Sequence, residues 1–215
     1  MKKLFVCFVL LITFIYFENI KARPISYQGG WTLMQKNNFN KHSIHLHYTP
    51  SIKYSLGYKG EYWLNKEWQF HGAQLNFLLK RLNKPKSQAN FYIKTGAGAA
   101  FSDYKNFDGK VEPLLFSGIS ADWEDRRYFI SYENRINYSN KIVKSFLQKS
   151  RIGITPYLGE YGDLHTWFML EVDHMPNSIN SIIYTPMVRM FKGDYLAEAG
   201  ISNYGDLMFN FIKRF

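Results

Sequence analysis

Apolar and polar residues alternate with a period of two along almost the whole chain from Tyr27 onward. In residues 54–62, tyrosine or leucine occupies each even position except Gly60, and serine, glycine, lysine or glutamate occupies the odd positions. Successive side chains of a β-strand point to opposite faces, so this pattern indicates strands with one apolar and one polar face. No segment after Ala22 shows a sustained helical period. The chain is therefore predicted to be all-β.

The polar face of the predicted strands carries many charged residues. A soluble β-sandwich or lipocalin-like barrel would have to bury one face, and burying this many charges would require each of them to be paired. A transmembrane barrel instead places the apolar face against lipid and the polar face toward a lumen. We expect an antiparallel up-and-down barrel of about twelve strands, with ten or eight as alternatives. The charges concerned include Lys59, Glu61, Arg135, Glu171, Arg189 and Glu198.

Aromatic residues make up 18% of the chain, more than is usual in a soluble protein. Membrane barrels use aromatic side chains as lipid-facing bulk and as girdles at both membrane interfaces. We expect Tyr62, Trp63 and Trp68 to belong to the outer girdle and Trp123 and Tyr128 to the inner one. A platform for stacking carbohydrate is the alternative interpretation of these groups.

The amino-terminal segment has the pattern of an export signal. Lys2 and Lys3 precede an apolar run from Leu4 to Phe17, which is shorter than the roughly 20 residues of a membrane-spanning helix. We therefore interpret residues 1–22 as a signal peptide and residues 23–215 as the barrel domain. The single cysteine, Cys7, lies inside the predicted signal, so the mature domain contains no disulfide, thiolate metal site or cysteine nucleophile.

The carboxyl terminus carries an aromatic stripe: Leu207, Phe209, Phe211 and the final residue Phe215 lie at alternate positions, with Lys213 as the exception. This ending resembles that of Gram-negative outer-membrane β-barrel proteins. The resemblance implies an outer-membrane location and insertion by the host's barrel-assembly machinery. It also implies that these four residues form the assembly signal.

Connections of alternating length are expected from such a barrel, which has short periplasmic turns and longer extracellular loops. The segments predicted to lie outside are residues 36–42, 63–69, 102–113, 137–148 and 174–181, and those predicted to lie inside include 49–51, 124–126, 159–162 and 192–194. Two segments break the alternation, because residues 82–89 form a long predicted inner connection and residues 203–206 a short outer one.

Charges of both signs are predicted to face the lumen. They either pair in layers that close a narrow barrel, or their cationic excess lines a pore that selects small anions. Size, strand number and positive charge are similar to those of the small twelve-stranded channels for acidic sugars in enterobacterial outer membranes, although no motif supports this resemblance. The expected lumen and selectivity residues are Lys59, Glu61, Lys94, Glu133, Arg135, Arg151, Glu171, Arg189 and Glu198.

His45 and His47 lie two apart on one strand face, a spacing at which two imidazoles can share copper or zinc. Met34, His71 and His165 are further inward-facing candidates. The simpler interpretation is that the pair fills polar positions of an amphipathic strand, so no metal site and no cofactor is predicted, and a metal-handling barrel is a minor alternative.

Catalysis is considered because some outer-membrane barrels hydrolyse lipids. His174 follows Asp173 at a predicted outer edge, and Ser139 and Asp103 lie in predicted outer loops, but no serine-centred motif of the lipid-modifying families is present. We therefore do not predict an enzyme. The cations are spread along the chain, which excludes the clustered basic face of a nucleic-acid-binding protein.

The working hypothesis is a monomeric outer-membrane barrel that passes small anionic solutes. Its expected partners are outer-membrane lipid, lipopolysaccharide and the barrel-assembly machinery. The alternative is a closed barrel with a structural or surface-interaction role.

Overall fold

The structure is a computed structural model that describes residues 27–105, 107–160, 162–176, 178 and 180–215. The predicted signal peptide lies outside the described residues. Within them the chain forms twelve strands and one short 3₁₀ turn, η1 (Leu64–Lys66). The strands are β1 (Trp31–Asn37), β2 (Lys41–Ser51), β3 (Tyr54–Trp63), β4 (Trp68–Lys84), β5 (Ser87–Ser102), β6 (Lys110–Asp125), β7 (Tyr128–Tyr138), β8 (Lys144–Ile154), β9 (His165–His174), β10 (Ile182–Lys192), β11 (Tyr195–Ile201) and β12 (Leu207–Arg214).

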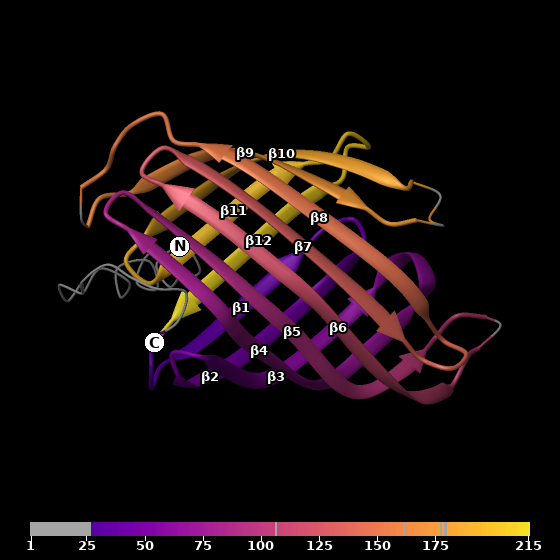
Figure 1. Ribbon diagram of the computed structural model, residues 1–215. Coiled ribbons are helices and arrows are strands. Elements are labelled where there is room, and N and C mark those ends of the chain that lie inside the picture. The colour runs from indigo at the N-terminus through magenta and orange to yellow at the C-terminus, as the bar shows by residue number, and fades with distance from the viewer. Residues whose placement is uncertain (1–26, 106, 161, 177, 179) are drawn as a thin grey trace, which may run out of the picture.

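Each strand pairs antiparallel with the next, and β1 pairs with β12 to close the barrel (Figure 1). The closing register runs from Thr32 opposite Arg214 to Asn37 opposite Phe209. Closure leaves no sheet edge with unpaired backbone groups, which is what a bilayer requires of strands. The predicted antiparallel up-and-down barrel of twelve strands is confirmed.

The connections lie at two ends of the barrel. We call the end with residues 27–30 and Phe215 the terminal rim, and the opposite end the far rim (Figure 1). Several predicted connections were wrong. Residues 49–51 belong to β2, which is joined to β3 by residues 52–53, and of residues 137–148 only 139–143 connect β7 to β8. Residues 82–89 are mostly strand, because β4 and β5 meet at the two residues 85–86. The inner connection predicted at 159–162 extends over the ten residues between β8 and β9. Residues 36–42, predicted as a loop, belong to β1 and β2 except for three turn residues.

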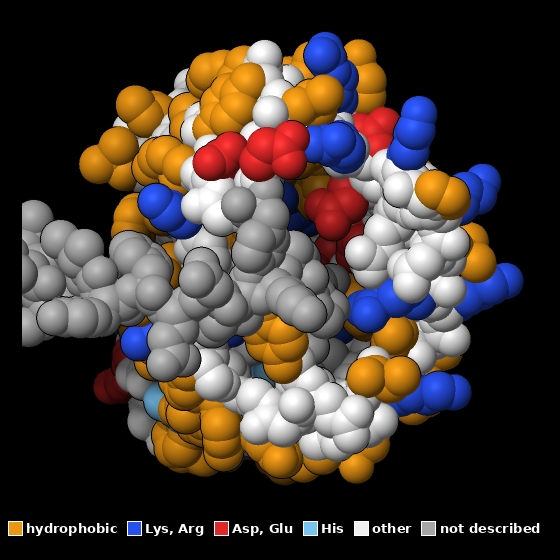
Figure 2. Space-filling model, turned by 90° about the vertical axis from the view of Figure 1, so that its left-hand side faces the viewer, with side chains coloured by type: hydrophobic (Ala, Val, Ile, Leu, Met, Phe, Trp, Pro, Cys, Tyr) orange, Lys and Arg blue, Asp and Glu red, His pale blue; other side chains and the backbone are white. Residues whose placement is uncertain are grey.

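In the end-on view of the terminal rim, apolar side chains cover much of the visible edge of the barrel, with Lys and Arg side chains among them (Figure 2). Leu56, Ile119, Ile152 and Phe168 are each about half exposed on four different strands. A soluble monomer rarely exposes one continuous apolar patch larger than a few hundred Å², so this surface is suited to lipid. In the part of the chain that the structure describes, no helix is long and apolar enough to cross a membrane.

Aromatic side chains on the outside gather at both rims. At the terminal rim the rings of Trp31 and Tyr48 lie 5.2 Å apart, and at the far rim Tyr138 is exposed. Two belts at the barrel ends are the arrangement expected at the two membrane interfaces. The exposed members at the terminal rim also include Tyr54, Trp123, Tyr128 and Phe215, and those at the far rim include Tyr62, Phe101 and Tyr184.

The last strand presents its alternate residues outward, as the sequence pattern indicates. Leu207 and Phe209 are exposed, whereas Met208 and Asn210, which alternate with them, are buried in the interior. Lys213 fits this face because its ammonium lies 5.5 Å from the ring centres of both Tyr195 and Phe215. An aliphatic stem can cover apolar surface while its charge stays at the membrane interface. The role of this strand in assembly stays a prediction.

Arginine at the lipid-facing position Ile119 is expected to lower the free energy of unfolding by about 2 to 4 kcal/mol, because it places a charge in hydrocarbon. Ile119 lies near the middle of β6 and is half exposed on the outer face. The measurement is urea unfolding in lipid vesicles. The matched control is Ser120→Arg, one residue further along, which points into the interior. If the Ser120 variant proves the less stable of the two, the assignment of the faces is wrong.

Candidate functional site

The interior of the barrel holds the charged residues that the alternation assigned to the lumen. Nine positions were expected there, and the structure places every one of them on the inner face of its strand. Their part in solute selection is a separate matter that the placement does not test. They are Lys59 and Glu61 on β3, Lys94 on β5, Glu133 and Arg135 on β7, Arg151 on β8, Glu171 on β9, Arg189 on β10 and Glu198 on β11.

Glu61 is the centre of the first ionic network. One of its carboxylate oxygens lies 2.7 Å from Lys41 Nζ, 2.7 Å from Arg135 Nη1 and 3.5 Å from Lys59 Nζ. Arg135 belongs to β7, which is separated from β3 by three strands around the wall. The contact between Glu61 and Arg135 therefore crosses the interior of the barrel and joins two strands that are not neighbours in the sheet. We call these four residues the Glu61 bridge.

An apolar cluster fills the part of the interior next to the Glu61 bridge. The guanidinium carbon of Arg135 lies 3.8 Å from the ring centre of Phe116, and the Phe70 ring meets Phe116 edge-on at 5.5 Å. This packing places the contact between Glu61 and Arg135 against an apolar layer at the far rim. The buried members of the cluster are Trp63, Trp68, Phe70, Ala100, Leu114, Phe116 and Val143.

Trp63 and Trp68 were predicted to belong to the outer aromatic girdle, and that prediction was wrong. Their side chains point inward, with exposed fractions of 5% and 1%. Their rings stack at 5.1 Å with an interplanar angle of 9°. The two residues are paired across β3 and β4 at the far rim, and odd positions of β3 face the interior. The alternation itself places Trp63 on the same face as Glu61.

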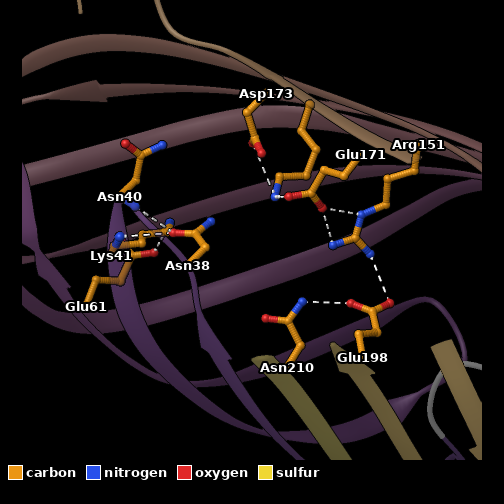
Figure 3. A network of polar contacts seen from close by, with 10 residues as sticks. Asn38, Asn40, Lys41, Glu61, Arg151, Glu171, Asp173, Glu198 and Asn210 are labelled. Carbon is orange, nitrogen blue, oxygen red and sulfur yellow. Dashed lines mark hydrogen bonds and ion pairs between the residues drawn. The ribbon is translucent and has the colours of Figure 1, made fainter. Parts of the chain in front are cut away.

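A second ionic network, the Arg151 chain, crosses another arc of the interior (Figure 3). Glu171 accepts from Lys149 at 2.5 Å and from Arg151 at 2.5 Å. Arg151 also reaches Glu198 at 3.2 Å, and Glu198 is 2.7 Å from Arg189. Because β8 and β11 are separated by two strands, the contact between Arg151 and Glu198 is a second contact across the interior. Asn210 donates to the other oxygen of Glu198 at 2.7 Å.

The central carboxylates of the two networks are withdrawn from the lumen, and their lysine partners are more exposed, whereas Arg135 and Arg151 are only 10% and 11% exposed. The side chains of Glu61 and Glu171 are 0% exposed, and that of Glu198 is 4% exposed. Lys41 and Lys149 remain 20% and 29% exposed. Water and solutes in the lumen therefore meet ammonium groups, with the compensating negative charge lying behind them.

Two carboxylates depart from this arrangement. Glu133 is 39% exposed and lies 2.5 Å from Lys94, and Asp173 is 14% exposed and lies 3.2 Å from Lys149. Both face the lumen beside a lysine. The interior is therefore mixed in sign, with a cationic excess at its accessible surface.

Two cavities lie in the interior of the barrel. The first, of about 200 Å³, extends toward the terminal rim and is lined among others by His45, Arg81 and Lys94. The second, of about 160 Å³, extends toward the far rim between the Glu61 bridge and the Arg151 chain. Six cations and two carboxylates line the second cavity. They are Lys36, Lys41, Lys59, Arg135, Lys149 and Arg151 with Glu133 and Asp173.

The histidine pair lies in the first cavity. The rings of His45 and His47 lie 4.6 Å apart with an interplanar angle of 36°, so they are tilted against each other. Among the described residues no group of three or more His, Cys, Asp or Glu side chains is placed to hold a metal ion.

The other residues proposed for that metal site are divided between faces. Met34 is paired with His45 and lines the same cavity. His71 was predicted to face inward, which was wrong: it is exposed on the outer surface, 2.7 Å from the Tyr58 hydroxyl. His165 is on the inner face at the terminal rim, 6.2 Å from the Phe191 ring.

The residues considered for catalysis are not assembled into a site. Ser139 donates to Glu112 at 2.8 Å, and Gln69 donates to Asp103 at 3.1 Å. Asp173 faces the lumen, whereas His174 points outward and lies 3.0 Å from the Gln148 side chain. Adjacent strand residues face opposite sides, so Asp173 and His174 do not act on one substrate.

The lumen cations missed in the sequence reasoning include Lys36, Lys41 and Lys149. The first two fall in a segment predicted as a loop, although β1 and β2 continue through it except at residues 38–40. Lys149 was left just outside a strand that begins at Lys144. Each of the three lies an even number of residues from an inward-facing position of its strand, and this spacing was the signal that could have assigned it to the lumen.

Comparisons with known proteins identify no family for this chain. No family model matches it, and no curated protein matches it. Among solved structures, a KdgM porin in complex with disordered oligogalacturonate is 9% identical, with a TM-score of 0.49 over 86% of this chain and 98% of its own. A second KdgM porin is 8% identical, with a TM-score of 0.49 over the same shares. A chain from a study of the in-meso crystallization of membrane proteins is 14% identical, with a TM-score of 0.46 over 88% of this chain and 83% of its own.

Proposed function

We propose that the protein is a narrow outer-membrane channel for small anionic solutes. The observation that carries this proposal is the exposure difference between the charges of the interior: Glu61 and Glu171 are fully withdrawn, and Lys41 and Lys149 face the lumen. A pore lined by cationic side chains attracts anions and repels cations. A solute in the lumen experiences this field at close range.

The width of the passage supports small solutes. The Glu61 bridge and the Arg151 chain each cross part of the interior, and the cluster of Trp63, Trp68 and Phe116 fills a further arc. Two cavities of about 200 Å³ and 160 Å³ lie beside these groups. Folded proteins and long polymers in coiled form do not fit such a space, whereas small carboxylates, phosphates and single extended chains do.

The membrane setting is part of the proposal. The apolar outer face and the two aromatic belts suit a bilayer, and the exposed Phe209 and Phe215 suit the carboxyl-terminal ending of outer-membrane barrels. Insertion by the barrel-assembly machinery, export by residues 1–22, contact with lipopolysaccharide and a monomeric state follow from the same proposal.

Purified protein in planar bilayers is expected to conduct in a KCl gradient, with a reversal potential displaced toward the chloride equilibrium potential. The displacement should shrink as KCl is raised, because the Debye length falls from about 10 Å at 0.1 M to about 3 Å at 1 M. A reversal potential on the potassium side would contradict the charge assignment. No channel events from correctly folded protein would favour a closed barrel with a structural or surface role.

A further inference from the structure

The two interior cavities meet at one group of side chains. Lys36 and Ser43 line both cavities from β1 and β2, Lys59 does so from β3, and Ser120 and Glu133 do so from β6 and β7. A group that lines the cavity toward the terminal rim and the cavity toward the far rim lies between them. We call these five residues the throat.

Lys36 is the first cation of the throat. Among the residues that the structure describes, no carboxylate lies within 4.0 Å of its ammonium. Its two cross-strand neighbours are Ser43 on β2 and Asn210 on β12, and neither carries a charge. The Lys36 ammonium is therefore available to a solute.

The other cation of the throat is only partly neutralised. Lys59 lies 3.5 Å from Glu61, and the same carboxylate oxygen is held at 2.7 Å by both Lys41 and Arg135. Lys59 is opposite Gly72 on β4 and His45 on β2, and its ammonium lies 5.6 Å from the centre of the Phe116 ring. The Lys59 ammonium consequently keeps hydrogen-bonding capacity toward the lumen.

Glu133 gives the throat its one carboxylate, and Lys94 holds it at 2.5 Å. This pairing has zero net charge, so Lys36 and Lys59 determine the sign of the local field. A carboxylate beside the passage also weakens the retention of an anion. A conducting site has to bind its solute well enough to admit it and weakly enough to release it.

On the basis of the proposed channel function, we propose that Lys36 and Lys59 form an oxyanion-binding site at the throat that selects the solutes passing between the two cavities. The ligand is a carboxylate or phosphate group, because its several oxygens accept hydrogen bonds from two ammonium groups at once. The two sources of this chemistry are separated by using inorganic phosphate as the probe and acetate as its comparison.

The test is block of the chloride current by inorganic phosphate. Lys36→Gln is expected to weaken the block about tenfold, which corresponds to about 1.4 kcal/mol, because it removes one hydrogen bond from a charged donor. Lys59→Gln should act in the same direction and leaves Glu61 with Lys41 and Arg135. The matched control is Lys144→Gln, because Lys144 lies 5.3 Å from the Tyr138 ring on the outer surface at the far rim. A smaller loss of block by acetate in Lys36→Gln assigns the site to phosphate-like ligands.

The failures of the two proposals are distinguishable. If the currents are anion-selective and phosphate blocks both throat variants as strongly as it blocks Lys144→Gln, the proposed binding site is wrong and the channel function stands. If the protein carries no current, ³¹P NMR titration of the barrel in detergent decides the site. Saturable broadening of the phosphate signal that is lost in Lys36→Gln supports it, and broadening that is absent or unchanged in the variant overturns it.

Discussion

Replacement of Glu61 by glutamine is expected to destabilise the barrel by about 3 to 5 kcal/mol, the usual effect of removing one partner of a buried ion pair. Glu61 is the shared partner of Lys41, Lys59 and Arg135, and its side chain is fully withdrawn from solvent. Glutamine keeps the shape but leaves three neighbouring cations without their negative charge. Urea unfolding followed by tryptophan fluorescence measures the change.

The matched control for this prediction is Glu160→Gln. Glu160 forms an ion pair with Arg126 at 3.8 Å, and its side chain is 86% exposed. Exposed pairs contribute about 0 to 1 kcal/mol, so this variant should unfold close to the wild type. Equal stabilities of the two variants would show that the Glu61 bridge does not stabilise the barrel. Those Glu61→Gln molecules that fold should prefer anions more strongly than the wild type.

Replacement of Trp68 by alanine is expected to have an effect of similar size. Large-to-small changes of buried tryptophan or phenylalanine cost about 3 to 5 kcal/mol, and Trp68 is 1% exposed and stacked on Trp63. The side chain lies in the apolar cluster that fills one arc of the lumen. Its removal should also raise the single-channel conductance, because Trp63, its stacking partner, lines the cavity toward the far rim.

Trp123→Ala separates this effect from a general loss of tryptophan. Trp123 is 37% exposed on the outer face of β6 near the terminal rim, where it contacts no part of the lumen. We expect a smaller loss of stability and an unchanged conductance, measured by circular dichroism during urea unfolding and by bilayer recording. A conductance that rises equally in both variants would place Trp68 outside the passage.

The faces of the strands followed from the sequence with few errors. Every odd position of β3 from Ser55 to Trp63 faces inward, as the alternation predicts, and the same holds for the residues expected in the lumen. Trp63, which was predicted to face outward, also follows this alternation. The loops were harder to delimit, since polar turn residues and polar lumen residues look alike in one sequence. For this reason Lys36 and Lys41 were not recognised as lumen residues.

The contacts inside the barrel did not follow from the sequence. Glu61 and Arg135 are 74 residues apart along the chain, and their contact depends on closure between β1 and β12 and on the strand tilt. The same is true of Arg151 and Glu198, and of the throat between the cavities.

Strand identity and facing are local properties, because the backbone turns each side chain to the opposite side of its neighbour; the residues of this chain therefore specify an apolar exterior and a charged interior directly. Which interior charges meet is a property of the closed cylinder. Barrel width and stagger set the distance across the lumen, and those distances join seven of the nine predicted charges, together with Lys41 and Lys149, into two networks that leave lysines facing the passage.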